Sequence, residues 1–386
     1  MRLVGLGALL VLGALSHAVF AMWAMRTFRW LEKRRRLVWS LVAIATVFAP
    51  AMRFVTRWTH GALSPLFALA ATEYLAIVIA VIPMIIGRMI FSLVYRTKNA
   101  AIPEPAPKPE AAPVTRRQII EGVYGGALLG ATNSVLGWGS LRGRHAFVIE
   151  EVPVRIVGLP RALDGYTIAQ ISDIHVGAVV QERELNEGLD RVREVKPDLV
   201  VLTGDLVDFD PGFIPMMARA LSSVRTRDGT FAILGNHDYY TGAQEVVAAL
   251  RAAGVDVLMN ESRIIQSGFA LLGVDDAWSK RYGAPGPRLD LALKDVAPEL
   301  PRILMSHQPD TIERWAGQVA LQLSGHTHGG QINPGFRPID FLTPYVSGRY
   351  DVRGTTMWIN RGFGVAGPPA RVGSAPEVTK IVLVAA

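Results

Sequence analysis

Long apolar stretches in the first 141 residues restrict the folds open to this chain. They are Leu3–Met25, Leu37–Met52, the region between Arg57 and Arg88, and Gly122–Leu141. The first has 23 residues without a charged side chain and the last has 20, and about 20 apolar residues suffice to cross a lipid bilayer. Residues 1–98 are therefore predicted to form a transmembrane helical region of about three spans.

Glu73 is the only charged residue inside the third stretch. It is either a functional acid within the membrane or a residue at the interface near the outer end of its helix. Charges deep in a bilayer are rare, which favours the interface. Pro83 in the same stretch predicts a kink, so this span is expected to be tilted or bent.

The charge is distributed unevenly along the chain. Residues 1–150 carry 17 Lys and Arg against 6 Asp and Glu, a net charge of +11. Residues 151–386 carry 23 against 27, a net charge of −4. The C-terminal part therefore lacks the basic surface of a nucleic-acid binder, and no nucleic-acid partner is expected. Cysteine is absent, which excludes disulfides and thiolate metal ligands.

Basic residues beside apolar spans also indicate which side of the membrane a loop occupies. The loop Arg26–Arg36 is strongly basic, so it is predicted to stay in the cytoplasm. The third span then returns the chain to the cytoplasm. If Gly122–Leu141 spans, the C-terminal domain lies outside the cell membrane, and if not, it lies in the cytoplasm. Basic residues ahead of this last stretch favour the extracytoplasmic side.

A proline-rich segment separates the apolar region from the rest of the chain. Ile102–Pro113 has five prolines in twelve residues, which predicts a semi-rigid linker over 99–117 without a core. Residues 118–144 are interpreted as a fourth span or a membrane-proximal helix, whose many Gly and Ala residues would also suit helix–helix packing. The oligomeric state stays open. Residues 145–386 are predicted to form a separate folded domain.

Within that domain, short β-rich runs alternate with helical patterns, which predicts an α/β domain with a largely parallel sheet. The expected elements are Thr167–Ser172, Glu182–Val195, Leu199–Thr203, Pro211–Val224, Phe231–Leu234 and Ala243–Ala252. Later strands lie closer together and favour a second, more antiparallel sheet. They are Phe269–Val274, Arg302–Met305, Ala320–Leu323, Met357–Asn360 and Val378–Val384.

The five histidines of residues 151–386 all lie in polar or glycine-containing stretches at the ends of apolar runs. In chain order these stretches are Asp173-Ile-His175, Gly204-Asp205-Leu-Val-Asp208, Gly235-Asn236-His237-Asp238, Ser306-His307 and Gly325-His326-Thr-His328. Each motif alone is weak, because a strand-end Asp-x-His or a Gly-Asp turn is common in proteins without metal. Side chains two apart in a strand point the same way, and strand ends gather at one edge of a sheet.

Together these stretches supply two carboxylates, an amide oxygen and four imidazoles, with His237 left over as a general acid. A mixed nitrogen and oxygen set suits Mn, Fe, Zn or Ni better than Ca or Mg. Seven ligands are too many for one tetrahedral ion but suit two divalent ions that share a carboxylate. Two such ions about 3.5–4 Å apart stabilise both the attacking and the leaving oxygen of a phosphoryl displacement.

The order of these five motifs resembles the signature of the calcineurin-like metallophosphoesterase superfamily over residues 165–385. Gly325–Gln331 and the segment from Asn360 through Glu377 are similar to its bacterial membrane-associated branch of YkuE- and YaeI-like phosphodiesterases. The resemblance implies a four-layer α/β fold of two β-sheets flanked by helices, here preceded by the transmembrane region.

The resemblance also implies roles for the site residues. The first metal ion would be held by Asp173, His175, Asp205 and His328. The second would be held by Asp205, Asn236, His307 and His326, with Asp205 bridging. A metal-bridging hydroxide would attack phosphorus, His237 would protonate the leaving oxygen, and Asp208 would orient His237. Asp238 receives no role.

The sequence departs from the protein phosphatases of this superfamily, which have Arg-Gly after the second motif. Phe209-Asp210 stands there instead, which counts against a protein phosphatase, and Arg361 is a candidate to contact phosphate in place of that arginine.

The expected activity is hydrolysis of a phosphodiester or diphosphate bond, with a lipid-linked substrate suggested by the membrane anchor and the family. UDP-diacylglucosamine-type precursors are one candidate, although they would require a cytoplasmic site. The alternative is a transporter or receptor with a regulatory or non-catalytic phosphoesterase module.

Overall fold

The computed structural model describes residues 2–58, 63–98, 116–266 and 268–386. The described residues form two compact units, divided between Trp138 and Gly139. We call them the helical unit and the sheet unit, and each is described by itself. Most of the predicted linker over 99–117 lies outside the described residues.

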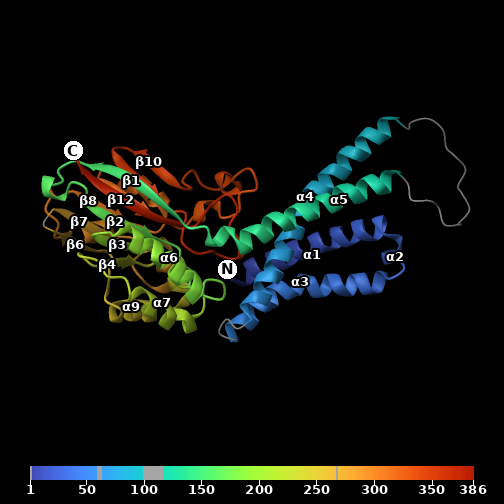
Figure 1. Cartoon of the computed structure of the whole chain (residues 1–386), viewed down its shortest axis with the longest axis horizontal. Coiled ribbons are helices and arrows are strands. Elements are labelled where there is room, and N and C mark those ends of the chain that lie inside the picture. Colours follow the sequence, from blue (N-terminus) through green and yellow to red (C-terminus); the bar gives the residue numbers. More distant parts are fainter. Residues whose placement is uncertain (1, 59–62, 99–115, 267) are drawn as a thin grey trace, which may run out of the picture. The chain divides into compact units, whose positions relative to one another are not determined.

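The helical unit consists of the helices labelled α1 to α5 in Figure 1. They are α1 (Arg2–Thr27), α2 (Arg29–Glu32), α3 (Arg35–Trp58), α4 (Ser64–Lys98) and α5 (Arg116–Leu141). Among the described residues, three stretches are long and apolar enough to cross a membrane: Leu10–Thr27, Arg35–Met52 and Leu69–Ile90. These correspond to the first three predicted spans. The fourth, Gly122–Leu141, is helical but is not among these candidates.

Glycines allow α5 to approach its neighbours closely. A Cβ atom on Gly125 would lie 2.4 Å from the ring of Trp23 in α1, and one on Gly87 of α4 would lie 2.7 Å from the ring of Tyr124 in α5. The indole Nε1 of Trp23 donates a hydrogen bond of 3.1 Å to the carbonyl of Glu121. Small residues at helix contacts are typical of membrane helix packing, so α5 belongs to the same bundle as α1 and α4.

Glu73 has a partner that the sequence did not reveal. His17 lies within the candidate span of α1, and its Nε2 is 3.8 Å from the Glu73 Oε1. Nδ1 of the same ring is 2.8 Å from the carbonyl oxygen of Gly13. Polar side chains within membrane helices commonly pair with one another. Because the two residues are 56 positions apart in the chain, the sequence around one gave no indication of the other.

Two six-stranded sheets form the centre of the sheet unit. The first has the order β1 (Val148–Ile156), β12 (Glu377–Ala385), β2 (Thr167–Ile171), β3 (Leu199–Thr203), β4 (Thr230–Ile233) and β5 (Val255–Val257). The second has the order β10 (Gly348–Val352), β11 (Thr355–Ile359), β9 (Leu321–Ser324), β8 (Arg302–Met305), β7 (Phe269–Gly273) and β6 (Glu261–Ile265). The β12–β2 pair is antiparallel in the first sheet, and β10–β11 and β6–β7 are antiparallel in the second.

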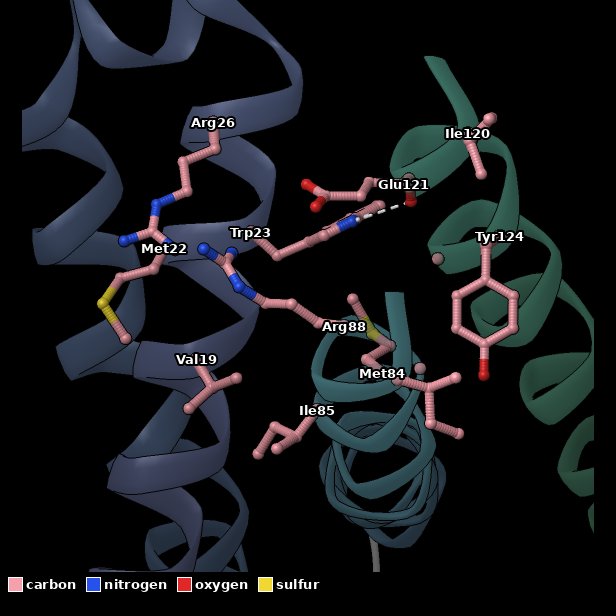
Figure 2. Close-up of a pocket in the computed structure, with 13 residues that line it drawn as sticks. Val19, Met22, Trp23, Arg26, Met84, Ile85, Arg88, Ile120, Glu121 and Tyr124 are labelled. Atoms are coloured by element: carbon pink, nitrogen blue, oxygen red, sulfur yellow. Dashed lines mark hydrogen bonds between the residues drawn. The ribbon is translucent and has the colours of Figure 1, made fainter. Parts of the chain in front are cut away.

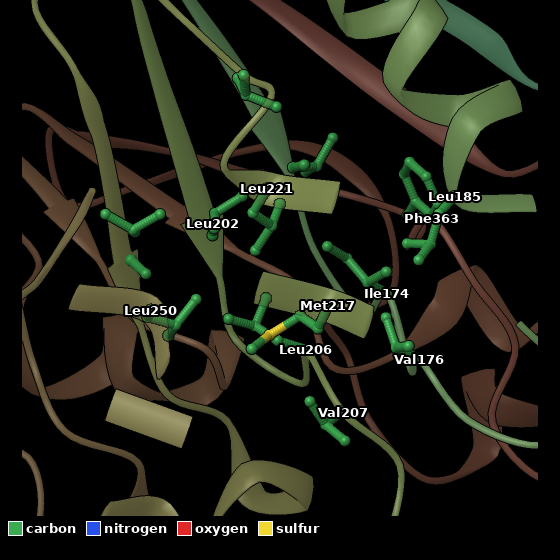
Figure 3. Close-up of a cluster of buried hydrophobic side chains, with 14 of the residues drawn as sticks. Ile174, Val176, Leu185, Leu202, Leu206, Val207, Met217, Leu221, Leu250 and Phe363 are labelled. Atoms are coloured by element: carbon green, nitrogen blue, oxygen red, sulfur yellow. The ribbon is translucent and has the colours of Figure 1, made fainter. Parts of the chain in front are cut away.

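Three buried clusters hold these sheets and their helices in four layers, which confirms the predicted fold class. Side chains of both sheets, such as Ile168, Val201, Leu271 and Leu323, pack together between them. The outer face of the first sheet packs against α6 (Glu182–Val195), α7 (Ile214–Leu221) and α9 (Ala243–Ala252) (Figure 3). The outer face of the second sheet packs against α10 (Leu289–Ala292) and α11 (Ile312–Trp315).

Four strands were missing from the sequence prediction: β1, β5, β6 and β10. β1 contains Pro153 and the pair Glu150-Glu151, which argue against a central strand. It lies at the edge of the first sheet, where proline is tolerated because one side of the strand makes no sheet hydrogen bonds. β5 has only three residues, too few for a visible period.

Gly188 of α6 provides a test of this packing. An alanine in a helix interior usually stabilises by about 1 kcal/mol relative to glycine. A Cβ atom on Gly188 would lie 2.1 Å from the ring of Phe363, whose side chain is buried. We expect Gly188→Ala to destabilise the unit by about 1–3 kcal/mol, as overpacking does, and to lower the melting temperature of the detergent-solubilised chain. The control is Gly137→Ala, where a Cβ atom meets nothing within 4 Å, so the melting temperature should not fall. A higher melting temperature in Gly188→Ala would contradict the packing described for Phe363.

Candidate metal centre

The polar motifs follow the carboxyl ends of five strands in the two sheets. Asp173 and His175 follow β2, Asp205 follows β3, and Asn236 begins the short helix α8 (Asn236–Thr241) after β4. His307 follows β8, and His326 and His328 follow β9. Because β2, β3 and β4 are parallel neighbours, as are β8 and β9, their ends bring residues from distant parts of the chain to one edge.

The backbone at this edge adopts an unusual conformation. Asp173, His175, Asp205, His326 and His328 have φ angles between 52° and 74°, in the left-handed region that few residues other than glycine occupy. Each such residue costs on the order of 1–3 kcal/mol, and these conformations concentrate at functional sites. Five of the seven predicted metal ligands therefore lie on strained turns, a feature that the sequence alone did not indicate.

One group of ligand atoms comes from Asp173, His175 and His328, and these atoms lie within 4.8 Å of one another. The Nε2 atoms of the two histidines are 3.0 Å apart, and His328 Nε2 is 3.4 Å from Asp173 Oδ1. Burial, His175 and Arg371 place the pKa of His328 well below its usual value, so its ring is neutral and able to act as a ligand.

A second group consists of Asp205, His307 and His326. His326 Nδ1 is 3.2 Å from His307 Nε2, which in turn is 3.3 Å from Asp205 Oδ2. His307 Nδ1 lies 2.8 Å from the carbonyl oxygen of Thr203, and because that oxygen only accepts, Nδ1 carries the hydrogen and Nε2 faces the group. Burial and the charge of His307 lower the pKa of His326 to about 4.

Asp205 connects the two groups. Its Oδ2 is also 3.7 Å from His175 Nε2 in the first group, while its Oδ1 accepts a 2.8 Å hydrogen bond from the backbone N–H of His237. Burial alone would raise its pKa, but His307 and the other histidines outweigh burial and hold the pKa well below the usual value. An anionic carboxylate between two groups of nitrogen ligands is the arrangement predicted for a shared ligand.

The residues fit divalent metal ions by two further observations. Two ligands each about 2.1 Å from one ion are separated by roughly 3.0–3.4 Å, and the facing ring nitrogens lie 3.0 and 3.2 Å apart. The buried amide oxygen Oδ1 of Asn236 has no hydrogen-bond partner among the described residues, although buried polar groups normally have one. The assignment of each residue to one ion stays a prediction.

His237 lies next to these groups with its predicted partner. Its Nδ1 is 2.8 Å from Asp208 Oδ1, and His175 Nδ1 is 3.8 Å from the same carboxylate. Burial would raise the pKa of Asp208, but the nearby His175 ring and the hydrogen bond with His237 hold it well below its usual value. Asp208 is therefore a carboxylate that can fix the orientation and tautomer of the His237 ring.

Aromatic side chains line the other side of His237, and sequence reasoning missed them. The ring centroids of Phe209 and Tyr240 lie 4.7 and 5.1 Å from that of His237, and the first two rings stack at 5.4 Å. Trp278 continues the row 5.8 Å from Tyr240. We call Phe209, Tyr240 and Trp278 the aromatic wall. The motifs do not include Trp278, which is about 40 residues beyond Asp238.

Asp238 and Arg371 support the site without facing it. The buried Asp238 carboxylate accepts hydrogen bonds from the N–H groups of Leu206, Val207 and Gly235 and so ties the second motif to the third. Burial and Asp205 raise its pKa to about 6. The guanidinium of Arg371 is fully buried, donates to four backbone carbonyls and lies 3.3 Å from His328 Nδ1.

Arg361 does not have the surroundings expected of a phosphate ligand. Its Nε is 2.6 Å from Glu377 Oε2, and a terminal nitrogen is 2.8 Å from Glu150 Oε2. Both carboxylates compete with a phosphate for the guanidinium. The structure therefore favours a role for Arg361 in joining β1, β12 and the loop after β11.

A family model described as Calcineurin-like phosphoesterase matches residues 166–330. The Bacillus subtilis protein named "Uncharacterized metallophosphoesterase YkuE" is 30% identical over 291 residues, which cover 70% of this chain and 98% of that protein. This chain belongs to the calcineurin-like phosphoesterase family. The resemblance seen in the motifs is confirmed, and with it a phosphoesterase domain whose family depends on metal ions.

Two animal relatives are both named "Transmembrane protein with metallophosphoesterase domain". The name combines a membrane region with a phosphoesterase domain. The Bos taurus protein is 34% identical over 269 residues, 66% of this chain and 60% of that protein. The Danio rerio protein is 33% identical over 248 residues, 61% of this chain and 57% of that protein. The match thus spans less than two thirds of either animal relative.

The metal content of variants distinguishes a side chain that binds metal from one that only lies beside the metal site. We expect the full-length chain purified with Mn²⁺ to hold two ions, as measured by inductively coupled plasma mass spectrometry. Asp205→Asn should lose most of the metal, because both groups of nitrogen ligands lie against this carboxylate. The control, Asp208→Asn, changes a half-buried carboxylate of the same site and should keep both ions; equal losses in the two variants would contradict the shared-ligand role.

Proposed function

We propose that this family member is a multi-pass membrane protein that hydrolyses a phosphodiester or diphosphate bond at a site for two divalent ions. The proposed division is a transmembrane region over 1–98, a linker over 99–117, a fourth span within 118–144 and a catalytic domain over 145–386. The observation that carries the proposed activity is the His237–Asp208 pair, 2.8 Å apart, beside two ligand groups that both approach Asp205.

The proposed ligands are Asp173, His175, Asp205 and His328 for one ion and Asp205, Asn236, His307 and His326 for the other. Divalent ions bound there would supply Lewis acidity for the phosphate oxygens and lower the pKa of a water molecule. The chain's own contribution is to hold and transfer a proton. When the His237 ring carries both protons, Nδ1–H donates to Asp208 and Nε2–H can pass to the leaving oxygen as the bond from phosphorus to that oxygen breaks.

The aromatic wall supports a phosphodiester with an organic leaving group over a phosphorylated protein side chain. Phe209 stands where the protein phosphatases have arginine, and its ring lies 4.7 Å from His237. A ring at this position offers apolar and stacking contacts but no charge for a phosphate oxygen. We therefore place the leaving group against Phe209, Tyr240 and Trp278, which suits an apolar or planar group, including one linked to a lipid.

Hydrolysis of model substrates tests this activity. The chain stripped of metal and reloaded with Mn²⁺ should cleave bis(p-nitrophenyl) phosphate faster than p-nitrophenyl phosphate, with no activity in Asp205→Asn. His237→Ala should lower kcat by about 10²–10⁴-fold, the usual contribution of a general acid, without loss of metal. The effect should be larger for an alkyl diester than for the p-nitrophenyl diester, because p-nitrophenolate leaves readily without a proton. Equal losses for both leaving groups would rule out His237 as the acid.

The proposed topology places the sheet unit on the extracytoplasmic side. Support comes from the basic loop after α1 and from the close packing of α5 against α1 and α4, which is expected of a fourth membrane helix. An outside domain favours phospholipid head groups or other outer-surface phosphodiesters over cytoplasmic nucleotide-linked lipids.

Because the chain has no cysteine, single cysteines report its topology directly. We expect a membrane-impermeant maleimide to label Lys294→Cys in intact cells and to label Arg34→Cys only after the cells are opened. Both wild-type side chains are exposed. Labelling of neither residue in intact cells would place the sheet unit in the cytoplasm and make α5 a membrane-proximal helix.

A further inference from the structure

The helical unit contains a cavity of about 320 Å³ between α1, α4 and α5 (Figure 2). Most of its wall is apolar and includes Val19, Met22 and Ile85, with Trp23 at one side. Arg26, Arg88 and Glu121 also line it. The volume is at the lower end of the range of about 300–1,000 Å³ found for small-molecule sites.

The charged and apolar parts of the cavity lie at different depths along the helices. Arg26 is the last residue but one of the candidate span Leu10–Thr27, and Arg88 is the last but two of Leu69–Ile90. With a rise of 1.5 Å per residue, both lie within about 3 Å of the end of their spans. Val19 lies seven residues before Arg26, or about 10 Å deeper along α1. Both arginines are exposed, and in Figure 2 they extend into the same region of the cavity.

This distribution matches the layout of a phospholipid. Guanidinium groups at the end of a span lie where lipid phosphates lie, and their planar donors suit two phosphate oxygens. The deeper apolar wall suits an acyl chain, and tryptophan is common at this interface. Basic cavities between membrane helices on the cytoplasmic side are known to hold anionic head groups.

The charge balance selects among lipids. Two guanidiniums and the carboxylate of Glu121 give the cavity a net charge of +1, which pairs with a head group of one negative charge. A zwitterionic head group has no net charge to gain from it. We infer that the cleft between α1, α4 and α5 binds one anionic phospholipid, with Arg26 and Arg88 on its phosphate and an acyl chain against Val19 and Ile85.

This site lies in the helical unit and is separate from the phosphoesterase residues. It rests on the proposed insertion of the helical unit in the membrane, which the cysteine labelling tests separately, and not on any hydrolytic step. The bound lipid is a structural or regulatory ligand of the bundle, held at the ends of α1 and α4 that continue into the basic loop and the linker.

Native mass spectrometry of the full-length chain tests the inference. The protein is released from detergent after titration with phosphatidylglycerol or with phosphatidylcholine of the same acyl chains, in EDTA so that hydrolysis is suppressed. We expect one phosphatidylglycerol per chain and at least tenfold weaker binding of phosphatidylcholine. R26Q/R88Q should weaken phosphatidylglycerol binding at least tenfold. The matched control, R35Q/R36Q, removes two exposed arginines from the same predicted side of the membrane and should change it less than twofold.

Ile85→Trp keeps both charges but fills the apolar part of the cavity, since Ile85 lines it and is 40% exposed. It should weaken phosphatidylglycerol binding to a similar extent and keeps the inference testable if R26Q/R88Q does not fold. Equal binding of the two lipids would overturn the inference, because the charge of the head group would then play no part. Equal losses in the arginine pair and its control would replace it with a non-specific charge effect. Unchanged binding in Ile85→Trp would show that the lipid lies elsewhere.

Discussion

The carboxylate of Asp205 is the constraint on which the sheet unit depends. It follows the central strand β3 and lies within 3.7 Å of a histidine from each ligand group. A buried carboxylate is costly unless it is paired, and here the pairing comes from His175 after β2 and His307 after β8. The loops from both sheets must converge for this charge to be tolerated. Backbone hydrogen bonds from the N–H of Asp173 to the carbonyl of Gly204 and from the N–H of His175 to that of Asp205 join the loops after β2 and β3.

Much of the sheet unit could be predicted from the sequence, because its strands β2, β3, β4, β8 and β9 are short apolar runs that end in polar motifs. Such runs predict parallel strands buried on both faces, and the polar residues after them predict a site at their ends. β1 was missed because Pro153 and two glutamates hide its pattern. The aromatic wall was missed because Trp278 comes from a separate short helix, Ala277–Tyr282, and spacing along the chain carries no information about such contacts.

The roles of Asp238 and Arg361 could not be predicted from the sequence either. Asp238 stands inside a motif, yet its task is to accept backbone hydrogen bonds from Leu206 and Val207, which only the folded loops reveal. Arg361, which the sequence made a candidate to contact phosphate, is instead paired with Glu377 and Glu150. In the helical unit, apolar length predicted the helices, but the partners His17 and Glu73 and the shared cavity of α1, α4 and α5 depend on packing that periodicity does not encode.

The position of β12 has a consequence for how the chain matures. This strand is the last of the described elements, yet it lies between β1 and β2 in the first sheet, and β1 has no other neighbour there. Asp173 and His328, which share a ligand group, are 155 residues apart. A ribosome must therefore deliver the chain through residue 385 before the first sheet can close, and partly made chains expose an open strand edge. The nascent domain therefore needs protection from edge-to-edge pairing until β12 has been made.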